Sequence, residues 1–223
     1  MGNPLSIIDT NSFKGRCEAM DIRQSIINNC TLKERIEAMP EDSVLFRSDF
    51  PEFHSEYVGA TLSELTDEGI LVKLAQGIYA KPRKSRFGIV FPSVDKVVQA
   101  IATRDKAQVL PSGMTALNLL GLSTQVPMNY TYLTTGSERV IKLANRNVIL
   151  KRGVPKNFCY KTRLVALLVQ ALKTLKQENV TDEELQTISS LISKEPDKES
   201  LMKDVGLMPA WMKRIVKPMV KTE

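Results

Sequence analysis

Hydrophobic side chains recur every three to four residues between residues 55 and 67 and then alternate with other side chains up to residue 80. The first pattern predicts an amphipathic helix, with a left-handed stop at Gly69. The second pattern, interrupted at Gln76-Gly77, predicts a tight two-stranded ribbon. Helix, glycine, strand, turn and strand is the order of the last helix and wing of a winged helix-turn-helix. The helical stripe consists of Val58, Leu62 and Leu65.

The residues before this segment supply the other elements of a winged helix. An amphipathic pattern runs from Ile22 to Met39, with Thr31 as a second helix cap, and Pro40 ends it. Residues 44–46 predict a short strand, and residues 48–51 predict a brief second helix closed by proline. We therefore expect a winged helix-turn-helix with a basic hinge over residues 20–86.

Residues 1–19 contain turn formers and no sustained period, which predicts a flexible N-terminal arm. Met20 is an alternative start of the native chain.

The rest of the chain, residues 87–223, predicts a mixed α/β domain that ends in helices. Helices capped by Ser93 and Ser112 alternate with strands near residues 108–110 and 130–134, and residues 141–150 form a hairpin. Further helices are expected over 162–177 and 181–193 and around Leu201 and Trp211. The predicted fold class is α+β, with the winged helix first.

Composition excludes several classes of protein. The chain has 223 residues, 43% of them hydrophobic, which suffices for one sizeable core or two small ones. No apolar run approaches the roughly 18 residues that suggest a membrane span, and no signal peptide precedes the first elements. The three cysteines are odd in number and show no paired spacing. We expect a cytoplasmic protein without membrane contact.

The net charge of +6 is unevenly distributed. Residues 20–80 carry five basic and eleven acidic side chains, whereas residues 87–160 carry nine basic and three acidic ones. Between them stands the basic run Lys81-Pro82-Arg83-Lys84-Ser85-Arg86. The predicted winged helix is itself acidic, so any contact with nucleic acid depends on where the cations lie.

The outward face of the predicted recognition helix is small and hydroxylated. Small residues let a helix lie deep in the major groove, and hydroxyls bind phosphates or base edges. The alternative is a solvated face or a protein-docking surface. The Glu56 carboxylate would repel phosphate, but it could accept a hydrogen bond from cytosine. The candidate residues are Ser55, Glu56, Gly59, Ala60 and Ser63.

The cations beyond the wing are candidates for binding the DNA backbone or an adjacent minor groove. The alternative is a solvated linker with ordinary surface charge. Arg47 and Ser48 near the brief second helix, and Lys73 on the wing, complete the predicted DNA-binding set, although Arg47 also suits a surface salt bridge. The cations of the basic run are Lys81, Arg83, Lys84 and Arg86.

The middle of the chain carries a second group of cations whose spacing suggests a charged sheet face over an apolar one. Such a face suits an acidic protein or nucleic acid, and equally an ordinary soluble surface. Its members are Arg104, Lys106, Arg139, Lys142, Arg146, Lys151 and Arg152.

The sequence gives little reason to expect an enzyme. His54 is the only histidine, and neither a G-x-S-x-G elbow nor a glycine-rich phosphate loop is present. Gly136-Ser137 is similar to the glycine-serine turn of nucleotidyltransferases, but paired aspartates do not follow it. The cysteines lack zinc spacing. We predict no catalytic residues, no metal and no cofactor.

Two segments resemble the AbiE-type abortive-infection antitoxins, a type IV toxin–antitoxin superfamily of winged-helix regulators. Residues 70–82, ILVKLAQGIYAKP, look like the wing, and residues 111–127, PSGMTALNLLGLSTQVP, with TYLTTG at 131–136 resemble the second-domain signature. The resemblance implies a repressor of its own operon and an antitoxin against a nucleotidyltransferase toxin. The family's DNA-binding half is usually basic, and here residues 20–80 depart from that pattern.

The expected partners are therefore operator DNA, bound by a homodimer or by cooperating monomers, and the cognate toxin, for which no contact residues are assigned. Two other interpretations stay open: a winged-helix module that binds only protein, and an RNA-binding factor that uses residues 81–152.

Overall fold

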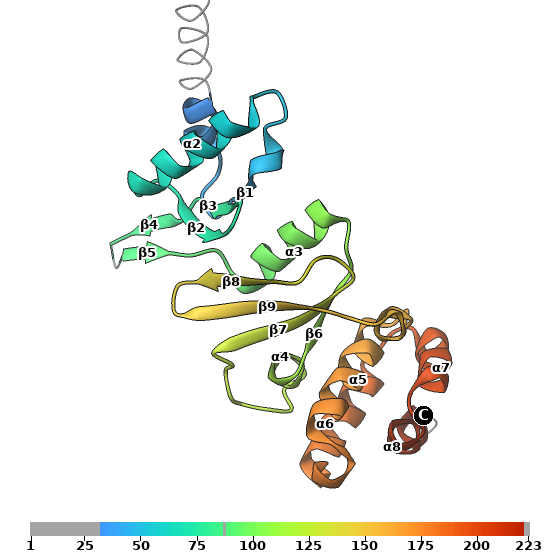
Figure 1. Cartoon of the computed structure of the whole chain (residues 1–223). Helices are drawn as coiled ribbons and strands as arrows, with labels where there is room; N and C mark the ends of the chain where they lie inside the picture. Colours follow the sequence, from blue (N-terminus) through green and yellow to red (C-terminus); the bar gives the residue numbers. More distant parts are fainter. Residues whose placement is uncertain (1–31, 87, 221–223) are drawn as a thin grey trace, which may run out of the picture. The chain divides into compact units, whose positions relative to one another are not determined.

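The computed structural model describes residues 32–86 and 88–220, which divide into two compact units, Met1–Pro92 and Ser93–Glu223 (Figure 1). The described residues form a mixed α+β fold, which confirms the predicted class. The predicted arm at 1–19, the possible start at Met20, the helical pattern before residue 32 and the cap at Thr31 lie outside the described residues.

The first unit places a small antiparallel sheet among short helices. Residues 32–38 are helical, and the next elements are strand β1 (Val44–Phe46), 3₁₀-helix η1 (Arg47–Asp49), helix α2 (Ser55–Asp67) and strands β2 (Val72–Ala75) and β3 (Ile78–Ala80). The sheet order is β1-β3-β2, with both pairs antiparallel. The strand at 44–46, the helix from Ser55 and the turn at Gln76-Gly77 were all predicted.

The brief second helix is shorter than predicted. Only Arg47–Asp49 forms a 3₁₀ turn, where a helix over 48–51 was expected. The Asp49 carboxylate accepts a hydrogen bond from the Phe46 backbone N–H at 2.9 Å, which closes this turn at its start. Phe50 leaves the helical region, as a residue before proline tends to do.

The core of the first unit joins the 32–38 helix, α2 and the sheet. The apolar stripe of α2 is buried, and each buried Leu or Val contributes roughly 1.5–3 kcal/mol relative to an exposed one. Gly69 has φ +70° at the end of α2, as the predicted stop requires. The core residues are Leu32, Ile36, Leu45, Phe50, Val58, Leu62, Leu65, Leu71 and Tyr79.

The segment predicted as a basic hinge is a second two-stranded ribbon. Strand β4 (Arg83–Ser85) pairs antiparallel with β5 (Gly88–Val90), and the ribbon belongs to the first unit. The Ser85 hydroxyl donates to the Gly88 carbonyl at 2.9 Å, and Gly88 adopts φ +116°. Because pairing needs the complementary residues 88–90, the charge run alone did not predict a strand.

The second unit contains a four-stranded mixed sheet, ordered β6-β7-β9-β8. Strands β7 and β9 are parallel, and the β6–β7 and β8–β9 pairs are antiparallel. The predicted hairpin over 141–150 is confirmed, with β8 and β9 somewhat longer than expected. The elements are α3 (Val94–Asp105), β6 (Val109–Ser112), α4 (Met114–Leu119), β7 (Asn129–Thr134), β8 (Arg139–Leu143) and β9 (Arg146–Arg152).

Helix α3 lies on one side of this sheet, and α4 and α5 lie on the other (Figure 1). The Tyr132 hydroxyl in β7 donates to Asp95 of α3 at 3.2 Å, and Arg139 of β8 pairs with Asp105 at 2.7 Å. The chain then continues through η2 (Pro155–Phe158), α5 (Arg163–Leu175), η3 (Gln177–Asn179), α6 (Asp182–Ser193), α7 (Lys198–Leu207) and α8 (Ala210–Val220).

The terminal helices share one cluster of buried side chains with β6 and α4. Leu168 and Leu172 of α5, Ile188 of α6 and Leu201 of α7 are fully buried there, and Trp211 packs partly buried against them. These helices are therefore core elements of the second unit. Among the described residues, no helix combines the length and the apolar character that crossing a bilayer would take.

Candidate nucleic-acid interface

Helix α2 turns one face to the core and the other to solvent. Val58, Leu62 and Leu65 are fully buried, so the periodicity identified the inner face correctly. On the outer face Ser55, Glu56, Ala60 and Ser63 are exposed, and Gly59 is half-buried. Apart from Glu56, the side chains that α2 itself places on this face are small.

Arg47 explains why Gly59 is half-buried. Its Nε donates to the backbone carbonyl of Ser55 at 2.7 Å, so the side chain lies along the start of α2. A Cβ atom at position 59 would lie 3.1 Å from the Arg47 Cζ atom. Gly59 therefore leaves room for a guanidinium, whereas the sequence suggested only that it lets a helix enter a groove. The exposed Arg47 side chain adds a fixed positive charge beside the outer face of α2.

Lys81 has a structural role that the sequence did not predict. Its Nζ donates to the backbone carbonyls of Ile36, Glu37 and Met39, at 3.4 Å for Ile36 and 2.7 Å for Met39. These are the carbonyls at the end of the 32–38 helix, where a cation is favourable. The Lys81 ammonium is thus occupied inside the first unit and does not suit the phosphate contact proposed for it.

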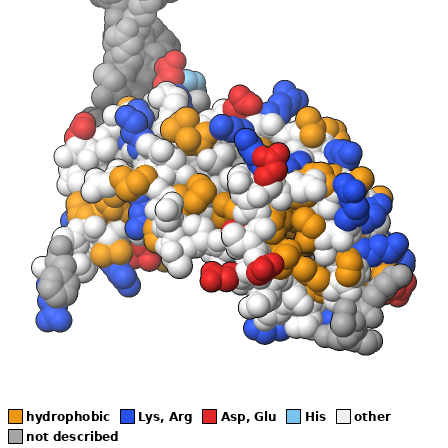
Figure 2. Space-filling model, turned by 90° about the horizontal axis from the view of Figure 1, so that it is seen from below, with side chains coloured by type: hydrophobic (Ala, Val, Ile, Leu, Met, Phe, Trp, Pro, Cys, Tyr) orange, Lys and Arg blue, Asp and Glu red, His pale blue; other side chains and the backbone are white. Residues whose placement is uncertain are grey.

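The other cations of the basic run lie on the β4–β5 ribbon. Arg83, Lys84 and Arg86 are exposed, and Lys84 pairs in register with Ile89, whose side chain is 53% exposed. Lysine and arginine side chains are visible at the free end of this ribbon in Figure 2. The ribbon therefore carries exposed positive charge beyond the three-stranded sheet, as the sequence suggested, but on paired strands.

The remaining predicted contacts lie on short, exposed elements. Ser48 is exposed in η1, and Lys73 is exposed on β2, opposite Tyr79. The β2–β3 connection consists only of Gln76-Gly77, with Gly77 at φ +69°. The ribbon formed by β2 and β3 is therefore compact, and β4–β5 extends the cationic surface.

Two other cations of the first unit are engaged by glutamates. Lys33 pairs with Glu68 at 2.7 Å, and Arg35 pairs with Glu52. The hydrogen bond to Glu68 raises the pKa of Lys33 above its ordinary value. Within the part of this unit that the structure describes, the exposed cations outside these pairs are Arg47, Lys73, Arg83, Lys84 and Arg86.

The basic residues of the second unit do not form the single charged sheet face that the spacing suggested. Arg139 shares its face with Ile141 and pairs with Asp105, which also pairs with Arg104. This happens because α3 covers that face and supplies the carboxylate. The Arg146 guanidinium lies 5.9 Å from the Tyr130 ring centre. Lys142 and Lys151 are exposed and stand on the opposite face.

These observations define a two-unit α+β protein with an exposed, cation-flanked helix in its first unit. The chain belongs to the family described as "Family of unknown function (DUF6088)", which matches residues 31–201 and so includes parts of both units. No curated protein matches the sequence. Among solved structures, the chain is similar to RV2827C protein from Mycobacterium tuberculosis. The identity is 16%, the match covers 86% of this chain and 81% of that one, and the TM-score is 0.42.

Proposed function

We propose that residues 20–86 act as a winged helix-turn-helix and that the protein is a DNA-binding transcriptional repressor. The order of elements supports this: a helix at 32–38, β1, the η1 turn, α2, and the β2–β3 ribbon. In the sheet order β1-β3-β2, the two strands that come next after α2 lie side by side and form the β2–β3 ribbon. In such a fold the helix before the ribbon is the one that enters the major groove.

The exposed face of α2 is the observation that carries the proposal. Its hydroxyls at Ser55 and Ser63 can bind phosphates or base edges, and Glu56 can accept from the amino group of cytosine. Arg47 lies beside the same face and supplies the charge that α2 lacks. Arg83 and Lys84 would contact the backbone at a second place, which supplies affinity and little sequence preference.

We further propose that the second unit acts as an antitoxin domain against a nucleotidyltransferase toxin of the same operon, in the cytoplasm. The support is the resemblance of residues 111–127 and 131–136 to the second-domain signature of AbiE-type antitoxins. The first of these segments spans the end of β6 and α4, and the second lies at the end of β7. Both therefore belong to one folded unit.

A titration of the DNA upstream of the protein's own gene tests the DNA-binding proposal. Fluorescence anisotropy should show saturable binding that a shuffled duplex of equal length does not match. Arg47→Ala should weaken binding by about tenfold, because a charge-assisted contact is lost. The control Lys142→Ala removes an exposed cation from the second unit and should bind normally. Equal affinity for both duplexes would rule out an operator-specific repressor.

The second candidate function is a winged-helix module that binds only protein. It is favoured by the exposed carboxylates of α2, which are Glu56, Glu64 and Asp67. These would repel a duplex and suit a basic protein partner. In the same titration this alternative predicts that neither duplex binds. The Arg47→Ala change would then not alter the anisotropy.

A further inference from the structure

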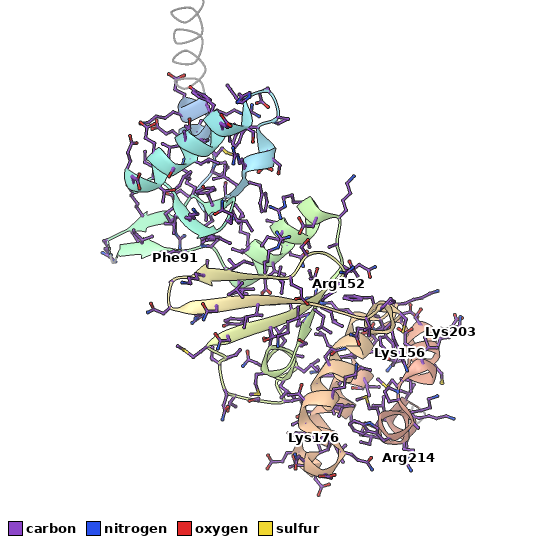
Figure 3. The ribbon with its side chains drawn as sticks, viewed as in Figure 1. Phe91, Arg152, Lys156, Lys176, Lys203 and Arg214 are labelled. Carbon is purple, nitrogen blue, oxygen red and sulfur yellow. The ribbon has the colours of Figure 1, made fainter. Side chains whose placement is uncertain are left out.

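The second unit is hollowed where β7 and β9 end. Two adjoining cavities of about 350 and 370 Å³ share Gln108 and Phe158 in their linings. Their walls come from the residues before β6, the end of β9, η2 and the beginning of α5. Arg152 and Lys156, labelled in Figure 3, lie on the segment that leads from β9 into η2. Each cavity is within the size range of small-molecule sites.

The aromatic ring of Phe158 lines both cavities and packs against a glycine. The Phe158 ring packs so closely on Gly153 that an added Cβ would lie 2.7 Å from the ring atom Cε2. A side chain at position 153 would therefore displace the ring. Tyr160 lines the larger cavity, and its burial raises the pKa of its hydroxyl above the ordinary value, so it stays neutral near pH 7. Both rings offer apolar faces to a ligand.

Positive charge surrounds these rings. Lys161 and Arg163 line the larger cavity, and Arg152 lines the smaller one. Two carboxylates on neighbouring elements accept backbone hydrogen bonds and keep their negative charge. Glu138 accepts from the Arg152 backbone N–H at 2.9 Å, and buried Asp204 accepts from the Thr162 N–H at 2.6 Å.

Two residues with amide side chains also line the cavities, Asn157 in the larger one and Gln108 in both. Asn157 is buried, and its Oδ1 accepts from Lys173 at 2.9 Å and from Gln170 at 3.5 Å. With both acceptor sites used, Asn157 can offer a ligand only its N–H donors. Burial and the neighbouring Lys156 lower the pKa of Lys173. Gln108 adds a second amide, shared by both cavities.

We propose that this hollow binds a nucleotide. Lys161 and Arg163 hold its phosphates, the base lies against Phe158 or Tyr160, and the amides of Gln108 and Asn157 contact the base edge. Cations, aromatic rings and amides together match the three parts of a nucleotide, whereas an acidic peptide would not require the rings. The site is independent of the DNA-binding proposal, because all its residues belong to the second unit.

Calorimetric titration of the full-length protein with ATP, GTP, CTP and UTP tests this proposal. At least one nucleotide should bind saturably, and inorganic tripolyphosphate should bind at least about tenfold more weakly because it lacks a base to stack. Lys161→Ala and Arg163→Ala should each weaken nucleotide binding about tenfold, since a charge-assisted contact is lost. Lys142→Ala removes an exposed lysine from the sheet of the same unit and should leave affinity unchanged.

Two variants test the ring separately from the charges. Gly153→Ala should lower nucleotide affinity and leave tripolyphosphate binding unchanged, because the added Cβ would meet the Phe158 ring and the Leu133 Cβ, neither of which carries charge. Should this variant fail to fold by circular dichroism, Phe158→Leu keeps an apolar side chain and removes only the stacking surface. Equal affinity for tripolyphosphate and every nucleotide would overturn the role of the ring.

Three further results would overturn the nucleotide site. One is the absence of saturable binding by any of the four nucleotides at millimolar concentration. Another is binding that neither Lys161→Ala nor Arg163→Ala weakens. The third is binding of an oligouridine RNA through these residues without binding of mononucleotides, which would make the hollow part of an RNA surface.

Discussion

Single residues of the same type do different things in the first unit, and their contacts decide which. Lys81 and Lys84 lie three residues apart in one basic run. The Lys81 ammonium donates to three backbone carbonyls, whereas Lys84 is exposed on β4. Position within a charge run therefore does not show which cation can meet a phosphate. The first prediction separates the two residues.

Lys81→Ala should lower the free energy of unfolding of the protein by roughly 1–2 kcal/mol, because the carbonyls at the end of the 32–38 helix lose their charged donor. Thermal unfolding followed by circular dichroism measures the change. Lys84→Ala is the matched control and should stay within about 0.5 kcal/mol of the native protein, as surface changes usually do. Equal stability of both variants would remove the structural role of Lys81.

Tyr132 makes a pH-dependent contribution to the stability of the second unit. Burial, followed by the charge of Asp95 and its hydrogen bond, raises the pKa of the Tyr132 hydroxyl above its ordinary value. A raised folded-state pKa means that this contribution is complete below about pH 10 and is lost as the pH rises further. The midpoint of urea unfolding should therefore fall less steeply between about pH 9 and 11 in Tyr132→Phe than in the native protein. Identical slopes would contradict this assignment.

At the scale of elements, the first unit combines an acidic exposed helix face with cations held on neighbouring elements. Helix α2 itself contributes no basic side chain, and η1 supplies Arg47 beside it. The β4–β5 ribbon supplies Arg83 and Lys84 from beyond the β2–β3 ribbon. In the proposed complex, recognition and electrostatic attraction therefore come from different elements, so they can be tested separately.

Arg83→Ala combined with Lys84→Ala should reduce the slope of log K against log salt by roughly 2, because two phosphate contacts and their released counterions are lost. Binding to the upstream duplex is measured at several salt concentrations. The control pair Lys142→Ala and Lys151→Ala removes two exposed cations of the second unit and should leave the slope unchanged. An unaltered slope in the ribbon variant would exclude β4–β5 from the DNA contact.

At the scale of the whole molecule, the boundary between the units determines how the functions can be divided. The sequence suggested a division after residue 86, but β5 continues to Val90 and the first unit ends at Pro92. A fragment cut near Gly88 would lose the partner strand of β4. A fragment that ends at Pro92 keeps every described element of the first unit.

The fragment ending at Pro92 should keep operator binding and lose the ability to relieve toxicity of the neighbouring gene product. Anisotropy with the upstream duplex and growth during co-expression measure the two activities. Full-length protein expressed at the same level is the control. Relief of toxicity by the fragment alone would contradict the proposed division between the two units.

Local pattern predicted much of the fold. The buried stripe of α2, the glycine stop at residue 69, the Gln76-Gly77 turn and the core helix α5 all follow from periodicity and turn chemistry over short segments. Four of the five predicted contact residues on α2 are exposed for the same reason, and Gly59 is half-buried beside Arg47. The extent of η1 and the ribbon at 83–90 were harder to predict. Each depends on residues outside the charged or apolar run from which the sequence identified the segment.

The sequence by itself determined the α+β class, the order of the elements of the first unit and the exposed face of α2, because these depend on residues a few positions apart. Only the tertiary structure decided that Lys81 caps a helix more than forty residues away, with Glu37 at a separation of 44. It also decided that Gly59 makes room for Arg47 and that Gln108 and Phe158 line the same two cavities. These contacts join residues far apart in the chain, and no local period records which distant side chains packing brings together.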